Sequence, residues 1–216
     1  MIRACIFDLD GTLLNTIKAL SYCISRTMEQ FGYGEIDEAH TKQFVGDGYK
    51  ELVRRALIFS GDKELRHFEE ACRLYLEIFA EHSLDEVAPY EGIEEVLEYL
   101  RKKNIRLAVL SNKPQAETEH NIIQIFGEGV FEKIYGQREG IPLKPDPRAL
   151  ELLMEELGVS RDEVLYFGDT STDMQTGANA GVKRVAVLWG FRSEEELASF
   201  SPEHMLRTPR EARGLI

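Results

Sequence analysis

The chain contains 216 residues, of which 43% are hydrophobic and 30% are charged. This composition is typical of a globular protein, and the length suits one domain or one domain with a smaller insert. The formal net charge of −12 disfavours non-specific binding to nucleic acid or to an anionic membrane surface. We therefore expect no nucleic-acid or membrane partner, and any phosphate chemistry in this chain requires a local cation.

The three cysteines, Cys5, Cys23 and Cys72, lie in apolar runs and have no short spacing. An odd count argues against a disulfide framework and a zinc site, so we interpret them as buried hydrophobic side chains. Met1 leads directly into a predicted strand without a charged and apolar leader, and no long apolar run follows. We expect a cytoplasmic protein, and the sequence leaves open whether it is a monomer or a homodimer.

Short apolar, β-branched or aromatic runs recur along the chain and predict buried strands. In chain order they are residues 4–7, 107–110, 133–135, 164–167 and 184–188. Helical spacing lies between most of them, as where Ile93, Val96, Leu97 and Leu100 recur at i, i+3, i+4 and i+7. Strands that alternate with helices predict an α/β fold with a parallel sheet covered on both faces.

One connection, after the first strand, is far longer than the dozen or so residues that an ordinary crossover needs. It contains two apolar stripes at helical spacing, one that begins at Ile17 and one that begins at Phe68. We predict an α-helical cap domain at residues 16–84, inserted into an α/β core of residues 1–15 and 85–216. Ligands in open α/β sheets bind beyond the carboxyl ends of the strands, so we expect the insert to act as a lid there.

The first strand runs directly into Asp8 and Asp10, two carboxylates separated by one residue. They can converge on one site if the chain bends, and Gly11 permits such a bend. The alternative is a tight Asp-Gly hairpin turn. A hairpin does not explain why a helical stripe, rather than a second strand, starts at Ile17.

Polar residues also follow two later strands. Ser111 and Asn112 end the second strand, where a hydroxyl and backbone amides can hold a phosphoryl oxygen, although simple helix capping ahead of Pro114 is an alternative. Asp169 and Asp173 follow the fourth strand as another carboxylate pair. Asp173 alternatively caps only the following helix.

Lys144 lies between a leucine and Pro145, and proline favours an extended conformation of the residue before it. A solvated surface lysine is the alternative. Taken together, the carboxylates, a hydroxyl and a lysine near strand ends match phosphoryl transfer. That chemistry needs hard oxygen ligands for Mg²⁺, a nucleophile, and cations for the spread charge.

Four motifs in the order FDLDGTLLNT, SNK, the lysine of KPDP, and GDTSTD resemble those of the haloacid dehalogenase-like hydrolase superfamily over essentially the whole chain. The resemblance implies a Rossmann-like core with an inserted helical cap, and a Mg²⁺ cofactor. It implies that Asp8 is the catalytic nucleophile that forms an aspartyl-phosphate. Asp10 would be the general acid and base, and Thr12 would support the turn.

The same resemblance implies roles for the later motifs. Ser111 and the amide of Asn112 would bind the phosphate, and Lys144 would orient the nucleophile and balance the phosphate charge. Asp169 would be a metal ligand together with Asp8 and the backbone carbonyl of Asp10. Asp173 would support the metal from outside its ligand shell.

Within the superfamily the chain looks most similar to phosphoglycolate phosphatases, which implies a small phosphorylated metabolite as substrate. The cap segment Gly46-Asp47-Gly48 resembles their cap signature and is the candidate substrate-specificity loop, although a plain loop between cap helices is the alternative. Asn15 stands where many relatives carry an acidic residue, and a pyrophosphatase branch also has asparagine there. A pyrophosphatase or a β-phosphoglucomutase-like phosphomutase therefore remains an alternative. Asp10 argues against a dehalogenase, and its position after the first strand argues against a receiver domain.

Overall fold

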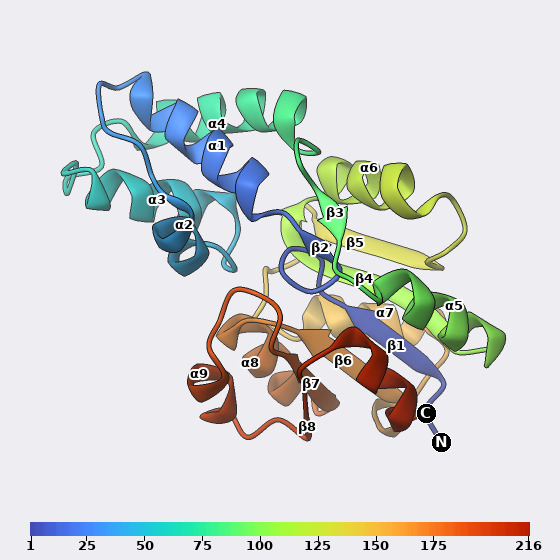
Figure 1. The fold of residues 1–216 in the computed structure, drawn as a ribbon. Coiled ribbons are helices and arrows are strands. Elements are labelled where there is room, and N and C mark those ends of the chain that lie inside the picture. The colour runs from blue at the N-terminus through green and yellow to red at the C-terminus, as the bar shows by residue number, and fades with distance from the viewer. The chain divides into compact units, whose positions relative to one another are not determined.

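The computed structural model describes residues 1–216. The chain divides into two compact units, one formed by Met1–Asn15 together with Ala88–Ile216 and the other by Thr16–Val87 (Figure 1). The second unit extends to Val87, whereas the sequence pattern placed the end of the insert at residue 84. Each unit has a hydrophobic core of its own.

The first unit is built on a six-stranded parallel sheet with the order β5-β4-β1-β6-β7-β8. Its strands are β1 (Ala4–Phe7), β4 (Arg106–Pro114), β5 (Lys133–Gln137), β6 (Val164–Gly168), β7 (Lys183–Val187) and β8 (His204–Leu206). The five predicted strands are all present. The edge strand β8 was not predicted because its three residues, His-Met-Leu, carry no β-branched or aromatic signal.

Helices cover both faces of this sheet, which confirms the predicted α/β class (Figure 1). They are α5 (Ile93–Lys102), α6 (Gln115–Phe126), α7 (Arg148–Leu157), α8 (Ser171–Ala180) and α9 (Glu194–Ala198), with 3₁₀ turns η1 (Arg161–Glu163) and η2 (Pro209–Leu215). One face of the sheet, including Ile6 and Tyr166, packs against the apolar stripe of α7. Gly158 ends α7 in the left-handed conformation that glycine adopts readily.

The second unit consists of four helices, α1 (Ile17–Glu29), α2 (Glu38–Phe44), α3 (Tyr49–Phe59) and α4 (Phe68–His82). Its core includes Ile24 of α1 and Leu57 of α3. Tyr75 and Phe79 of α4 are buried and stack with ring centroids 5.4 Å apart. No helix in either unit is long and apolar enough to cross a membrane.

The strand order brings the segments of interest together. β1 lies between β4 and β6, and Phe7 at its end pairs with Val109 on one side and Phe167 on the other. Because all three strands are parallel, the residues that follow them emerge at the same edge of the sheet. A short antiparallel pair, β2 (Leu14–Asn15) and β3 (Ala88–Pro89), joins the segment where the chain leaves this unit to the segment where it returns.

Candidate active site

The loop after β1 turns sharply at Gly11, which has φ +87°. A Cβ atom at this position would also come within 2.3 Å of the Asp169 carboxylate, so both the conformation and the space require glycine. The loop is held from two sides: Trp189 Nε1 donates to the carbonyl of Thr12 at 3.0 Å, and Thr12 Oγ1 donates to Asp169 at 3.1 Å. The Asp-Gly hairpin alternative is wrong, because both neighbours of β1 are parallel strands.

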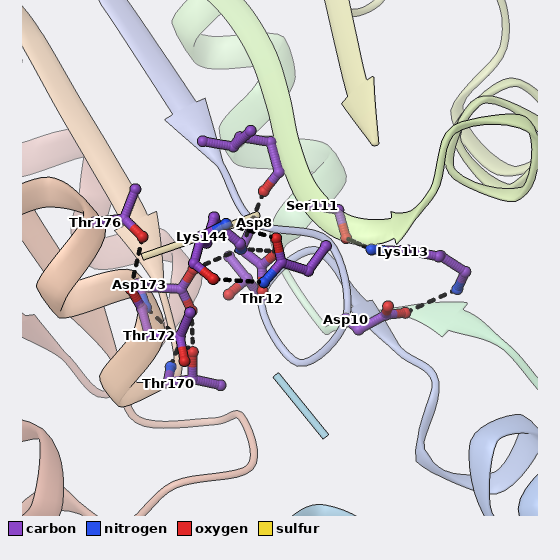
Figure 2. A network of polar contacts seen from close by, with 12 residues as sticks. Asp8, Asp10, Thr12, Ser111, Lys113, Lys144, Thr170, Thr172, Asp173 and Thr176 are labelled. Carbon is purple, nitrogen blue, oxygen red and sulfur yellow. Dashed lines mark hydrogen bonds and ion pairs between the residues drawn. The ribbon is translucent and has the colours of Figure 1, made fainter. Parts of the chain in front are cut away.

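Lys144 lies at the centre of the site (Figure 2). Its Nζ donates to Asp8 Oδ1 at 2.8 Å, to Asp173 Oδ1 at 2.7 Å and to the carbonyl of Leu110 at 3.2 Å. Only 2% of its side chain is exposed. The solvated-lysine alternative is therefore wrong, and the ammonium group joins the end of β1 to the start of α8.

Asp173 is held by partners on its own strand–helix junction. Its Oδ1 accepts from the hydroxyl of Tyr166 at 2.8 Å, and its Oδ2 accepts from the hydroxyl of Thr170 at 2.6 Å and from the Thr170 amide at 3.1 Å. Thr170 and Asp173 form a capping box at the start of α8, so the capping alternative is also true. Both carboxylate oxygens have donors, which suits a supporting position better than direct metal ligation.

Asp169 is completely buried at the end of β6. Its Oδ2 accepts from the backbone amide of Phe191 at 2.8 Å, and its Oδ1 accepts from Thr12. Burial, followed by the nearby charge of Asp173, raises the pKa of Asp169 to about 7. In this environment a cation close to the carboxylate would favour its ionised form.

Three buried carboxylates, Asp8, Asp169 and Asp173, offer oxygen atoms that all lie within 4.8 Å of one another. Burial first, then Asp173 and Asp169, raises the pKa of Asp8 well above its usual range, although Lys144 opposes this. Burial acts to raise the pKa of Asp173 too, but Lys144 and the Thr170 and Tyr166 hydrogen bonds hold it below its usual value. One lysine cannot neutralise three carboxylates, and such an oxygen set fits a hard divalent cation.

Ser111 and Asn112 lie at the end of β4 and are both buried. Ser111 Oγ accepts from the amide of Lys113 at 3.2 Å. The N-cap of α6 is Pro114, and the helix has no side-chain cap bond, so the simple capping alternative for Ser111 is wrong. The side chain of Asn112 instead binds the backbone of Lys144, with Oδ1 accepting from its amide at 2.9 Å and Nδ2 donating to its carbonyl at 3.1 Å.

The structure reveals a second buried ion pair that the sequence did not predict. Lys113 Nζ lies 2.9 Å from Asp10 Oδ1, and the two side chains are 3% and 14% exposed. Figure 2 shows the Asp10 carboxylate turned toward Lys113 and away from the group around Lys144. The motif SNK contained Lys113, but spacing alone could not show which carboxylate it meets.

The loop Trp189–Phe191 is a further site element that sequence reasoning missed. Besides the bonds to Thr12 and Asp169, Gly190 lies so close to Asp169 that an added Cβ would meet its Cβ at 2.3 Å. No local pattern indicates this role, because it depends on the approach of segments far apart in the chain.

In the helical unit, the candidate specificity loop lies between α2 and α3. Gly46 and Gly48 have φ +123° and +87°, and the Asp47 carboxylate pairs with Arg55 Nη2 at 2.5 Å. Both glycines therefore occupy conformations that other residues rarely adopt. This geometry fits a substrate loop and a plain connector equally well, so the loop's role stays a prediction.

Comparison with known proteins places this geometry in a family. Residues 5–187 match the haloacid dehalogenase-like hydrolase family. The chain is 32% identical to a phosphoglycolate phosphatase of Aquifex aeolicus, over 99% of this chain and 96% of the relative. It is 30% identical to the pyrophosphatase PpaX of Halalkalibacterium halodurans, over 96% of this chain and 93% of the relative.

A solved structure gives the same result. The crystal structure of an inferred phosphoglycolate phosphatase from Lactobacillus delbrueckii subsp. bulgaricus superimposes with a TM-score of 0.89 at 31% identity, covering 99% of this chain and 98% of that one. Sequence, fold and the arrangement of the four motif segments thus agree. The chain belongs to the haloacid dehalogenase-like hydrolase family.

Proposed function

We propose that the protein is a Mg²⁺-dependent phosphatase that hydrolyses a small phosphate monoester, 2-phosphoglycolate first among candidates, through an aspartyl-phosphate on Asp8. One observation carries most weight: Lys144 holds the Asp8 carboxylate at 2.8 Å at the end of the central strand. A buried carboxylate fixed beside a cation is oriented for attack on phosphorus, with the charge of the phosphoryl group balanced nearby.

The proposed reaction has two steps. In the first, an Asp8 oxygen forms a bond to phosphorus while the bond from phosphorus to the ester oxygen breaks, and Asp10 gives its proton to the departing alkoxide. In the second, a water attacks the phosphorus, the bond to Asp8 breaks, and Asp10 takes the proton from the water. Ser111 and the Asn112 amide bind the phosphoryl oxygens, and Asp8 and Asp10 return to their starting states.

The metal would be held by Asp8, Asp169 and the backbone carbonyl of Asp10, with Asp173 outside the ligand shell. When bound, Mg²⁺ supplies positive charge to the transferring phosphoryl group. The protein's own contribution is to keep the carboxylates converged: Thr12 and Phe191 fix Asp169, and Tyr166 and Thr170 fix Asp173.

The test is phosphate release from a panel of esters in Mg²⁺. A chelator is then added to remove the metal, and excess Mg²⁺ is added back. We expect turnover of 2-phosphoglycolate that stops on chelation and returns with Mg²⁺. Full turnover in excess chelator contradicts the metal assignment, and no turnover of any phosphate ester contradicts the function.

A pyrophosphatase is the alternative that one observation favours, because a relative with that name is nearly as similar to the chain as the phosphoglycolate phosphatase is. The core site serves either substrate, so selectivity must come from the surroundings of the leaving group. We propose that the Gly46–Gly48 loop contributes to it. Gly46→Val should change the ranking of phosphoglycolate against pyrophosphate and β-glucose 1-phosphate, and an unchanged ranking identifies the loop as a connector.

A further inference from the structure

The ion pair between Lys113 and Asp10 is buried, and it includes the residue that we propose as the proton donor to the leaving group. The two residues belong to neighbouring strand ends: Asp10 lies in the loop after β1, and Lys113 lies near the end of β4. Their side chains meet at 2.9 Å with 3% and 14% exposure. A lysine ammonium is rarely buried to this degree without a negative partner.

The position of Lys113 is fixed by its backbone. Its amide donates to Ser111 Oγ at 3.2 Å, and its carbonyl accepts from Thr118 Oγ1 at 3.2 Å. Gly136 of β5 also packs closely here, because an added Cβ would come within 2.7 Å of that carbonyl. The backbone of Lys113 is therefore anchored at both its donor and its acceptor, beside the residue proposed to bind phosphate.

Asp10, in contrast, has two tasks that conflict. In this structure its carboxylate faces Lys113 and points away from Asp8 and Lys144 (Figure 2). To protonate the ester oxygen it must turn toward the phosphoryl group on Asp8. That movement breaks the buried ion pair with Lys113, which is unfavourable, and a second negative group that binds the ammonium would offset the loss.

We propose that Lys113 is a specificity-determining residue that binds a second anionic group on the leaving group of the substrate. The inference rests on the proposed phosphatase function and names its substrate class: short phosphate esters or anhydrides with a carboxylate or phosphate close to the ester oxygen. Such a group takes the place of Asp10 on Lys113, and the released Asp10 carboxylate takes up a proton from solvent, which it then gives to the ester oxygen. An uncharged leaving group leaves Asp10 on Lys113.

The experiment compares 2-phosphoglycolate with its amide, glycolamide phosphate, which has the same shape without the carboxylate charge. kcat/KM is measured in Mg²⁺ for the wild type, Lys113→Met and Lys113→Arg. Lys183→Met is the matched control, because Lys183 is an exposed lysine at the start of β7. Thermal unfolding of each variant checks that it is folded.

We expect Lys113→Met to lower kcat/KM for phosphoglycolate roughly 10- to 100-fold, the usual effect of losing a charge-assisted hydrogen bond. The value for glycolamide phosphate should not fall, because Asp10 is no longer held by a cation. Lys113→Arg, which keeps the charge, should retain the preference for the charged ester, and Lys183→Met should match the wild type.

An equal loss on both esters overturns the inference, because it shows that Lys113 only supports the site. A wild type that does not prefer phosphoglycolate to its amide, or pyrophosphate to methyl phosphate, also overturns it. If such a wild type still turns over the uncharged esters in a Mg²⁺-dependent way, the proposed phosphatase function holds and only the role of Lys113 is wrong. If Lys113→Met does not fold, two other results decide whether the inference holds. They are the ratio of kcat/KM for phosphoglycolate to that for glycolamide phosphate in Lys113→Arg, and the same ratio in the wild type.

Discussion

The side-chain amide of Asn112 forms two hydrogen bonds with the backbone of Lys144, one to its N–H and one to its C=O. This pair ties the end of β4 to the segment that delivers the lysine to Asp8. The backbone amide of Asn112 remains the proposed hydrogen-bond donor to the phosphate, so its side chain and its backbone serve two different parts of the site. Asn112 is thus a positioning residue for Lys144 as well as a candidate phosphate-binding residue.

Asn112→Ala removes both side-chain bonds while it keeps the backbone amide. We expect kcat/KM to fall roughly 10- to 100-fold, because leaving the buried backbone groups of Lys144 unsatisfied costs about 1–3 kcal/mol and displaces the lysine. The rate of phospho-enzyme formation should fall by about the same factor as kcat, since Lys144 would no longer hold Asp8 in place. Rapid-quench measurement of the phospho-enzyme checks this.

The matched control is Asn179→Ala. Asn179 is an exposed asparagine that donates one hydrogen bond to the carbonyl of Pro145, on the same segment. It should lose less than a few-fold in kcat/KM, because exposed bonds are replaced by water. Equal losses in the two variants would show that the segment is simply loosened, and that Asn112 has no special link to Lys144.

Asp8→Asn should abolish both turnover and the trappable phospho-enzyme, because an amide is not a useful nucleophile toward phosphorus. Asp10→Asn should instead slow turnover by about 10² to 10⁴-fold, the usual contribution of general acid–base catalysis. Asp162→Asn, at an exposed aspartate, is the control and should leave activity unchanged. Phosphate found on any residue other than Asp8 contradicts the assignment of the nucleophile.

The pH dependence follows from Asp169, whose pKa is raised from 3.8 to about 7 by burial and by Asp173. A carboxyl with a raised pKa in the folded state stabilises the fold below its unfolded pKa. That contribution is lost as the pH rises through about 7. Without metal, the protein should therefore lose stability as the pH rises from about 4 to about 7, which is the interval between the two pKa values of Asp169. A bound Mg²⁺ compensates the ionised form, so the increase in Tm caused by Mg²⁺ should grow with pH over the same range.

Thermal unfolding with and without Mg²⁺ across this pH range is the measurement. Asp169→Asn is the informative variant, because the asparagine side chain cannot ionise, so the increase in Tm caused by Mg²⁺ should be smaller and should depend less on pH than in the wild type. A Tm shift that is the same at all pH values would mean that the metal does not compete with a proton on Asp169.

How far the sequence predicts this molecule differs between its parts. The strand ends at Asp8, Ser111 and Asp169 could be located because each follows a short buried strand, and parallel strands end at one edge. Lys144 could be suspected only as part of a set, because a lone lysine next to a proline is ordinary. The contacts of Asn112 and Lys113 could not be predicted, since each joins segments that meet only after the sheet has formed.

The loop at Gly190 shows the same limit and allows a last test. Gly190 belongs to no recognisable motif, yet its Cα lies against Asp169. Gly190→Ala would place a methyl group 2.3 Å from the Asp169 Cβ and 2.5 Å from both Asp169 Oδ2 and the Gly11 carbonyl. These atoms are backbone or a short, fully buried side chain, so they cannot move aside cheaply. We expect Asp169 to be displaced, and the Mg²⁺ concentration that gives half-maximal activity to rise at least about ten-fold, since one metal ligand is misplaced.

Gly34→Ala is the matched control, because a Cβ at Gly34 meets nothing within 4 Å and its backbone conformation suits alanine. It should leave the Mg²⁺ requirement unchanged. Activity measured as a function of Mg²⁺ concentration separates the two effects: a loss of kcat at saturating Mg²⁺ with no change in the half-saturation point would indicate general distortion. A higher half-saturation point with kcat partly restored by excess Mg²⁺ would place the fault at the Asp169 carboxylate, and so assign the Trp189–Phe191 loop to the metal site.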